Sequence, residues 1–471
     1  MKVEQLFTGC LAEMAYYIHS KGEAAIIDPL RETEPYIEMA KADGAKIKYI
    51  FLTHFHADFV SGQVDLAKKT GATIVFGPNA DPMYDIHKGK DGEKFKIGDL
   101  SLELLHTPGH TMESSSYLLI DEKGNKPYVF TGDCLFIGDV GRPDLAVKSD
   151  LTQADLAGHL FDSLRNKIMT LPDDIIVYPN HGAGSACGKN MSSETFDTLG
   201  NQKKTNYALR ADMTKEEFIE EVTTGLKPPP QYFGNNVRMN KGVNIGIDEI
   251  LLKGTSPIDA DSFKEMSEHN DILVIDTRTK EIYTNEGTVP GAWYIGLGGS
   301  FAPWVGALIS NINQKIIFIA EEGREQEVVT RFSRVGYDNI LGYLRGGIHS
   351  WKAAGHKVDQ IGSMSATQFA NSLKEGSMGV ALDVRKESEY LSEHVVGVEN
   401  FPLDFIHTNF AEINVDKEYF LHCASGYRSL IAASIFQANG VKKVTDVRGG
   451  FKDIKDTGVK LTDYVCPTTL L

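Results

Sequence analysis

The sequence lacks the features that mark secreted, membrane-spanning and nucleic-acid-binding proteins. It holds only five cysteines, far apart and without a Cys-x-x-Cys pair, so no disulfide framework is expected. No window approaches roughly 18 apolar residues, and the N-terminus has no apolar signal segment, which predicts neither a membrane span nor secretion. The 64 acidic residues outnumber the 48 basic ones, and the net charge of −16 argues against binding nucleic acid or anionic membranes. We therefore expect a cytoplasmic protein.

A breaker segment and an internal repeat divide the 471 residues into three expected domains. The segment Leu226–Gln231 contains three consecutive prolines and fits a linker that closes the first domain. Beyond it, a strand-like run followed by Asp-x-Arg occurs twice, and each copy has an Arg-Gly-Gly further on. The repeat pairs Ile272–Arg278 with Val380–Arg385, Ile317–Gly323 with Phe420–Gly426, and Leu344–Gly347 with Val447–Gly450. We expect domains at residues 1–240, 245–357 and 362–471, the last two being homologous α/β modules.

Short β-like runs alternate with helical patterns in the first domain. Apolar runs of this length, bounded by turn residues, favour buried strands. The expected strands are Ala24–Asp28, Ile47–Leu52, Ala72–Phe76, Leu102–His106, Ser116–Ile120, Tyr128–Gly132 and Ile175–Pro179, and the expected helices include Val64–Thr70 and Thr152–Lys167.

Histidines and aspartates follow several of these strands directly. The stretch Thr53–Phe59 places His54, His56 and Asp58 after a strand, where α/β proteins usually bind ligands. His110, Asp133 and His181 each stand at another strand end, beside glycine or proline. Imidazole and carboxylate together suit zinc or iron. The phenyl ring of Phe59 cannot bind a metal, which limits how many ions the motif holds.

These motifs resemble the metallo-β-lactamase superfamily, whose THxHxDx, TPGH, TGD and xPxH patterns occur here in the family's order. The resemblance implies an αββα sandwich over about the first 240 residues. Within that superfamily, the segment Gly141–Leu145 and the single-metal pattern make this domain more similar to the persulfide dioxygenases than to the lactamases or glyoxalase II. In that group one Fe(II) is held by the residues that correspond to His54, His110 and Asp133. Persulfide dioxygenases usually keep a histidine at the Phe59 position, so the chain departs from their pattern as well, but only the two-metal interpretation needs it.

The same resemblance implies roles for the neighbouring residues. His56, Asp58 and His181 are expected to orient ligands or to bind substrate, although His56 is itself a ligand in the related zinc hydrolases. Arg142, held by Asp144, is expected to pair with an anionic group of the thiol carrier, with a salt bridge alone as the alternative. Cys187 lies on a Gly-rich loop and is expected to face the substrate, with an inert buried thiol as the alternative, whereas Cys134 is expected in the core.

A second constellation lies in the third domain, at His422–Ser429. A cysteine between a strand and a helix sits under free backbone N–H groups, which favour the thiolate. This Cys-x-x-Gly-x-Arg-Ser loop resembles the rhodanese sulfurtransferases, which implies that Cys423 carries sulfur and that Arg428 holds its oxyanions. The other loop residues expected to contact substrate are Ser425, Gly426, Tyr427 and Ser429. In the first copy Ala320 stands opposite Cys423 and Glu325 opposite Arg428, so we expect that copy to be inactive.

The whole chain resembles the bacterial fused persulfide dioxygenase–rhodaneses. That resemblance implies one Fe(II) per chain, with zinc as the alternative. It also implies three small-molecule partners: O2, sulfite and a persulfide of the glutathione, coenzyme A, cysteine or bacillithiol type. A homo-oligomer is expected as well. The product would be thiosulfate, made from sulfite and the Cys423 persulfide, as in sulfide detoxification. Two other interpretations stay open: a zinc thioester hydrolase of the glyoxalase II kind with rhodanese appendages, and a non-catalytic protein that binds or senses sulfane sulfur.

Overall fold

The computed structural model describes residues 1–147 and 150–466 and divides into two compact units. The first unit covers Met1–Ile247 and the second begins at Asp248. Over the described residues, none of the helices combines the length and the apolar character that crossing a lipid bilayer requires.

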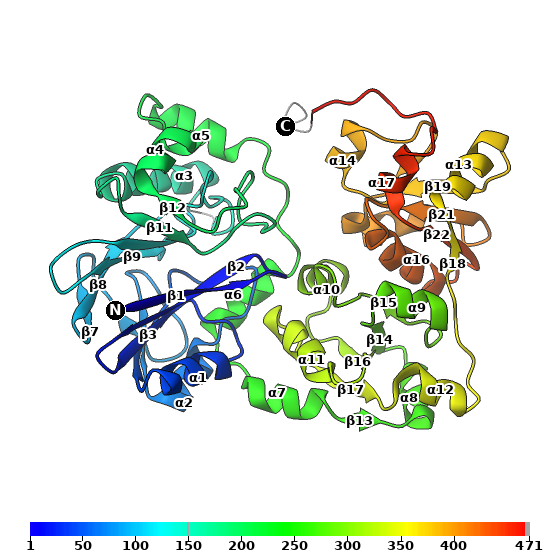
Figure 1. Ribbon diagram of the computed structural model, residues 1–471, viewed down its shortest axis with the longest axis horizontal. Coiled ribbons are helices and arrows are strands. Elements are labelled where there is room, and N and C mark those ends of the chain that lie inside the picture. The colour runs from blue at the N-terminus through cyan, green and yellow to red at the C-terminus, as the bar shows by residue number, and fades with distance from the viewer. Residues whose placement is uncertain (148–149, 467–471) are drawn as a thin grey trace. The chain divides into compact units, whose positions relative to one another are not determined.

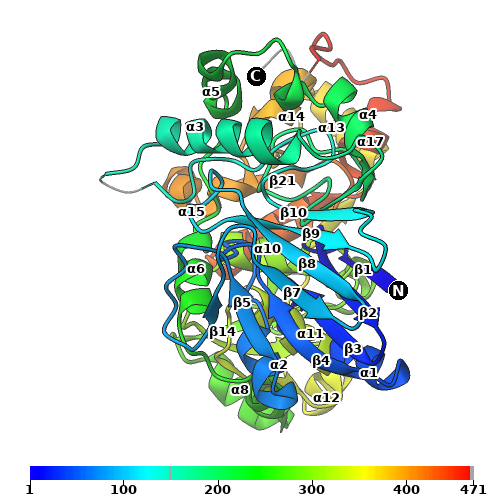
Figure 2. The ribbon, with the colours of Figure 1, turned by 90° about the vertical axis from the view of Figure 1, so that its left-hand side faces the viewer.

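The first unit contains two six-stranded sheets packed face to face (Figure 2). The first sheet has the order β1 (Lys2–Thr8), β2 (Glu13–Ser20), β3 (Glu23–Ile27), β4 (Lys46–Phe51), β5 (Thr73–Phe76), β6 (His87–Lys88). The second has the order β12 (Asp197–Thr198), β11 (Ile176–Pro179), β10 (Tyr128–Gly132), β9 (Ser115–Ile120), β8 (Leu100–His106), β7 (Lys94–Ile97).

Alternation along the strands builds three apolar layers. On β2, Tyr16 and Ile18 face the core between the sheets, while Ala15 and Tyr17 face the helices outside. This is the period of two that a strand imposes, and burial of both faces explains why the runs are apolar throughout. The covering helices are α1 (Glu34–Ala42) and α2 (Gln63–Thr70) on the first sheet, and α3 (Gln153–Ser163), α4 (Leu199–Thr205) and α5 (Lys215–Thr223) on the second. The predicted αββα sandwich is confirmed.

One helix was not expected from the sequence. After the proline-rich segment at 226–231, α6 (Phe233–Lys241) returns to the first unit, and its Asn240 contacts the loop that follows β4. The prolines break helices locally but carry no information about where the chain goes next. Segment 226–231 is therefore an internal loop of the first unit rather than its closing linker.

The second unit contains the repeat as two five-stranded sheets of equivalent order (Figure 1). The first sheet runs β13 (Pro257–Ile258), β17 (Ile340–Leu344), β16 (Lys315–Ile319), β14 (Ile272–Asp276), β15 (Trp293–Tyr294). The second runs β18 (Gly362–Met364), β22 (Lys443–Val447), β21 (Glu418–His422), β19 (Val380–Asp383), β20 (Glu399–Asn400). All these pairings are parallel, as α/β modules require.

Helices connect the strands of each copy. Those of the first copy are α8 (Ala260–Ser267), α9 (Lys280–Glu286), α10 (Phe301–Leu308), α11 (Glu325–Arg334) and α12 (Gly347–Ala353), after α7 (Ile247–Gly254). Those of the second are α13 (Ala366–Glu375), α14 (Glu387–Ser392), α15 (Ile406–Asn409), α16 (Arg428–Ala438) and α17 (Gly450–Lys455). The two predicted α/β modules are confirmed as folds, whereas their predicted boundaries stay a prediction.

Candidate metal centre and sulfur-transfer loop

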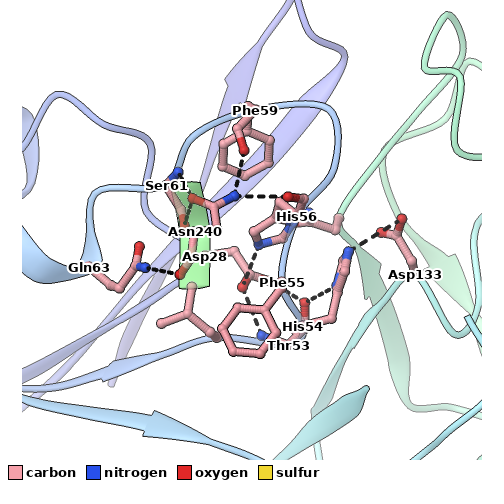
Figure 3. A network of polar contacts seen from close by, with 12 residues as sticks. Asp28, Thr53, His54, Phe55, His56, Phe59, Ser61, Gln63, Asp133 and Asn240 are labelled. Atoms are coloured by element: carbon pink, nitrogen blue, oxygen red, sulfur yellow. Dashed lines mark hydrogen bonds and ion pairs between the residues drawn. The ribbon is translucent and has the colours of Figure 1, made fainter. Parts of the chain in front are cut away.

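The loop after β4 is fixed by a buried carboxylate at the end of β3. Asp28 accepts hydrogen bonds from the Thr53 backbone N–H and hydroxyl, both at 2.8 Å (Figure 3). Because the Thr53 hydroxyl donates to Asp28, it accepts from His54 Nδ1, 3.0 Å away. His54 therefore presents the lone pair of Nε2, the form in which imidazole binds a metal.

His110 is held in the same way from the opposite sheet. Its Nδ1 donates to the carbonyl oxygen of Arg142 at 2.9 Å, which leaves the Nε2 lone pair available. The loop can pass this close because residue 141 is glycine. A Cβ atom on Gly141 would lie 2.1 Å from the Asp133 carbonyl oxygen and 3.0 Å from His110 Nδ1.

Asp133 faces both imidazoles with an unsatisfied carboxylate. Its Oδ2 lies 3.3 Å from His110 Nε2 and 3.8 Å from His54 Nε2, and all three residues are buried. Neither carboxylate oxygen of Asp133 accepts a hydrogen bond from the described parts of the chain. A buried carboxylate left in this state is costly unless a cation compensates it. The three expected ligands are thus brought together, with donor atoms within 4.8 Å of one another, and they fit a divalent metal.

The charge state of His54 agrees with a ligand role. Burial lowers the pKa of His54 well below its usual value, and the neighbouring histidines lower it further. His54 is therefore neutral near pH 7, as a ligand must be.

A second group of potential ligands adjoins the first. His56, Asp58 and His181 offer atoms within 4.8 Å of one another. His181 Nε2 lies 3.5 Å from Asp58 Oδ2 and 3.7 Å from Asp133 Oδ1. His56, however, uses its Nε2 in a 3.0 Å contact with Asp28. Burial alone would lower the pKa of His56, but Asp28, together with the charges of Asp58 and Asp133, raises the pKa above its usual value.

Phe59 occupies the place next to this second group. Its ring is fully buried and stacks on His56, with centroids 4.3 Å apart. A side chain without a donor atom therefore covers one side of His56.

Asn240 is a site residue that the sequence did not reveal. Its amide nitrogen donates to the carbonyl oxygens of His56 and Phe59, both at 2.8 Å, and its Oδ1 accepts from the Ser61 N–H (Figure 3). This one buried side chain thereby supplies hydrogen-bond partners for three backbone groups of an irregular loop, which has no strand or helix to pair them. Asn240 belongs to no motif, so only the fold could identify it. Asp28 was missed too, although its position at the end of an expected strand was a usable signal.

Arg142 and Asp144 form a bidentate pair, with both N–O distances 2.6 Å. The remaining guanidinium donors of Arg142 reach the carbonyl oxygens of Ala186 and Lys227. These bonds occupy the side chain within the protein, and its backbone oxygen orients His110. The predicted contact with substrate stays a prediction for both residues.

Cys187 lies beside the expected metal ligands. Its sulfur is within 4.8 Å of donor atoms of Asp133 and His181. Burial, together with the charges of Asp58 and Asp133, raises the pKa of Cys187 well above its usual value. A raised pKa favours the protonated thiol, and the predicted contact of Cys187 with substrate stays a prediction. Cys134 is buried, as expected, and burial raises its pKa to about 12.

In the second unit, Cys423 lies between β21 and α16, as predicted. The Gly426 N–H donates to Cys423 Sγ at 3.2 Å, and the Ser429 hydroxyl lies 3.5 Å from the same sulfur. Gly426 has φ +91°, a conformation that other residues rarely adopt. Donors aimed at the sulfur stabilise a thiolate or a persulfide anion there.

Arg428 is paired with a carboxylate from α14. Its two terminal nitrogens contact Glu389 at 2.6 and 2.8 Å. Burial opposes the charge of Arg428, yet the bonds to Glu389 raise its pKa above the usual value. An oxyanion at Cys423 would share or replace Glu389, so substrate contact stays a prediction for Arg428. It stays a prediction for Ser425 as well, which is exposed in the loop.

The Asp-x-Arg motif has the same structural role in both copies. Asp383 and Arg385 pair at 2.6 Å, and Asp276 and Arg278 pair at the same distance. Each arginine also donates to a carbonyl oxygen eight or nine residues further on, in the loop after a helix. The Asp-x-Arg motif of the first copy therefore serves its folding. Its Ala320 and Glu325, however, stand where the second copy has Cys423 and Arg428, so the first copy lacks the nucleophile and the anion-binding arginine.

Comparison with known proteins agrees with the division of the chain into one first domain and two copies of another. Residues 8–181 match the family described as the metallo-beta-lactamase superfamily. Residues 259–354 and 365–457 each match the rhodanese-like domain.

Individual relatives differ in the function that their names state. "Probable hydroxyacylglutathione hydrolase glo2" of Schizosaccharomyces pombe is 34% identical over 41% of this chain and 72% of its own length. The mitochondrial persulfide dioxygenase of Homo sapiens is 31% identical over 44% of this chain and 74% of its own. A crystal structure described as a metallo-beta-lactamase from Staphylococcus aureus is 31% identical, with a TM-score of 0.63. That alignment covers 73% of this chain and 98% of the other.

Proposed function

Because the chain belongs to the metallo-β-lactamase superfamily and carries two rhodanese-like domains, we propose that it is a persulfide dioxygenase coupled to a sulfurtransferase. In the first reaction a low-molecular-weight persulfide, O2 and water give the thiol, sulfite and two protons. In the second, sulfane sulfur passes through Cys423 to sulfite and yields thiosulfate. A cytoplasmic homo-oligomer is part of the same proposal.

The observation that carries the proposal is the set of three donors with Phe59 beside it. His54, His110 and Asp133 offer three donor atoms close together. If they held a metal as a facial set, several positions would stay open for substrate and O2. Phe59 stacks on His56, and by the resemblance it stands where a further donor would complete a second site. A single ion of this type is typical of non-haem iron oxygenases, so we propose one Fe(II) per chain.

The protein's own contribution is to position and isolate the reacting groups. Bound Fe(II) would supply the O2 chemistry that amino-acid side chains lack. Thr53 and the Arg142 carbonyl fix the tautomers of His54 and His110, so that both Nε2 lone pairs point to one place. The burial of all three ligands excludes bulk water and protects the reactive sulfur species.

At the second site the Cys423 thiolate attacks the outer sulfur of a persulfide. The sulfur–sulfur bond of the donor breaks, its thiolate leaves, and Cys423 becomes a persulfide. Sulfite then attacks that outer sulfur, so thiosulfate departs and the Cys423 thiolate returns. The Gly426 N–H and the Ser429 hydroxyl stabilise the thiolate at the start and the end of this cycle.

The proposal is tested by metal content and O2 uptake. Protein purified anaerobically and loaded with Fe(II) or Zn(II) is assayed with glutathione persulfide and other persulfides. We expect one iron per chain, and O2 uptake with thiosulfate as the main product by the iron form only. Iron-loaded protein that leaves every persulfide unoxidised would overturn the proposal. Stoichiometric labelling of Cys423 without any turnover would then favour a sulfur-binding or sensing protein.

A zinc thioester hydrolase is the second candidate, favoured by the group of His56, Asp58 and His181. If this group binds an ion, the protein holds two metals per chain, as a binuclear hydrolase needs. The same preparations distinguish the candidates, because two zinc ions per chain with hydrolysis of a hydroxyacylglutathione thioester would establish the hydrolase.

A further inference from the structure

The side chain of Tyr427 points away from Cys423's own copy and into the first one. Tyr427 stands between Gly426 and Arg428, in the loop expected to hold the reacting sulfur. Its hydroxyl donates to the carbonyl oxygen of Gly296 at 2.7 Å, and its ring meets Tyr294 edge-on. A loop residue of the intact copy is thus bound by backbone of the inactive one, within the same unit.

The receiving segment, Gly296–Gly299, is shaped for this ring. A Cβ atom on Gly299 would lie 2.4 to 2.7 Å from three atoms of the Tyr427 ring, closer than side chains ever pack. The segment is itself fixed within the first copy. The Leu297 N–H donates to the Thr277 carbonyl at 3.0 Å, and the Leu297 carbonyl accepts from Arg331 at 2.8 Å.

A second contact ties the first copy to the helix that follows the loop. The Tyr294 N–H donates to the Ser434 hydroxyl at 2.8 Å, and Ser434 is buried on α16. Helix α16 begins at Arg428, directly after Tyr427. The loop and the middle of its helix are therefore both held by the first copy, through two hydrogen bonds and one ring contact.

We propose that the inactive copy is a positioning element of the sulfur-transfer site: its Gly296–Gly299 segment holds Tyr427 and thereby fixes the Cys423 loop. The proposal rests on the proposed sulfur transfer at Cys423. Tyr427 precedes Arg428 and follows Gly426, so a displaced ring moves the N–H that faces Cys423 Sγ and the guanidinium together. A displacement of about 1 Å in such a site can cost roughly 100-fold in rate. The absence of Cys and Arg at the corresponding positions of the first copy leaves this role intact, because the contacts come from Gly296, Gly299 and Tyr294.

Two neighbouring glycines give a matched pair of variants. Gly299→Ala forces Tyr427 to move, whereas a Cβ on Gly298 meets no described atom within 4 Å. Neither residue has a positive φ, so alanine adds no backbone strain at either. We expect Gly299→Ala to lower kcat for sulfur transfer from a persulfide to sulfite by about 10-fold or more. Gly298→Ala should match wild type in sulfur transfer and thermal midpoint, and O2 uptake should stay unchanged in both.

Two further measurements separate positioning from general damage. In a Tyr427→Leu background, Gly299→Ala should have no additional effect, because the residue it displaces is already gone. Amide hydrogen exchange of residues 424–428 should accelerate in Gly299→Ala and not in Gly298→Ala. Should Gly299→Ala fold poorly, Tyr427→Phe removes only the bond to Gly296 and is expected to lower kcat a few-fold with KM little changed.

The outcomes distinguish this proposal from the one it rests on. If wild-type protein transfers no sulfur, the proposed function fails, while the exchange experiment still decides whether Gly299 holds the loop. If Gly299→Ala transfers sulfur as fast as Gly298→Ala, or if its effect adds fully to that of Tyr427→Leu, the positioning role is wrong.

Discussion

At the scale of single residues, the buried carboxylate of Asp133 lacks hydrogen-bond partners among the described residues and needs a cation to offset its charge. The substitution Asp133→Asn keeps the shape of the side chain and removes its charge. We expect metal content to fall at least about 10-fold, since loss of even an orienting group costs that much. In metal-free protein the same change should raise the thermal midpoint, because it removes an uncompensated buried charge. Metal analysis and thermal unfolding of chelated protein check both parts. A metal-free variant less stable than metal-free wild type would contradict the expectation.

Asp446 is a second residue whose charge is poorly accommodated. It is buried on β22, near Ser429 and thus near the sulfur, and burial raises its pKa from 3.8 to about 6. The folded protein therefore binds this proton more tightly than the unfolded chain does. Stability is lost as the pH rises from about 4 to about 6. Two pKa units correspond to about 3 kcal/mol.

Asp446→Asn removes this titration. We expect the variant to be more stable than wild type at pH 8, by up to about 3 kcal/mol, and close to wild type at pH 4. Denaturant unfolding of the two proteins at both pH values measures the difference. An equal effect at the two pH values would show that the carboxylate does not titrate in this window.

The clustering of the three candidate ligands could be predicted from the sequence, because their motifs lie at strand ends and strand ends converge. Asn240 could not, and Asp28 could be suspected only from its position at the end of an expected strand. The bonds that both residues make span at least 25 residues of sequence, and hydrogen-bond partners of this kind carry no local pattern. The pairing of Arg428 with Glu389 was missed for the same reason.

At the scale of elements, expected and observed strands agree closely where both faces are buried. The expected strand Tyr128–Gly132 is found unchanged as β10. The expected helix at 152–167 ends earlier, at Ser163, and continues as a single π-helical turn. Helix α6 escaped prediction altogether, because its neighbourhood is rich in asparagine and glycine, which are weak helix formers.

Helix α6 is nevertheless needed by the metal loop, through Asn240. Asn240→Ala would leave the carbonyl oxygens of His56 and Phe59 and the N–H of Ser61 without their partner. We expect a loss of about 2–4 kcal/mol in stability of the first unit and weaker metal binding. Asn235→Ala, on the same helix, serves as the control, since Asn235 contacts only an exposed arginine among the bonds described. Thermal unfolding and metal titration measure both effects. Equal stability of the two variants would mean that water replaces the Asn240 bonds.

At the scale of the whole molecule, the two proposed chemistries should be separable by mutation. Cys423→Ser removes the only nucleophile of the Cys-x-x-Gly-x-Arg loop and leaves the first unit's ligands untouched. We expect normal O2 uptake with a persulfide, sulfite as the final product, and no enzymatic thiosulfate. Quantification of sulfite and thiosulfate during turnover checks this, with Cys466→Ser as a control for loss of an exposed thiol. Thiosulfate production by Cys423→Ser would contradict the coupling.

Mixing two defective proteins tests how the intermediate travels. Asp133→Asn lacks the first activity and keeps Cys423, while Cys423→Ser has the reverse defect. Because sulfite is a small, diffusible anion, the mixture should restore the yield of thiosulfate, at a rate that rises with the concentration of the Asp133→Asn protein. Full yield without any dependence on that concentration, or no restoration at all, would show that free sulfite does not link the two sites. The same mixture made with Asp133→Asn, Gly299→Ala should restore thiosulfate about 10-fold more slowly, since only the second site has changed.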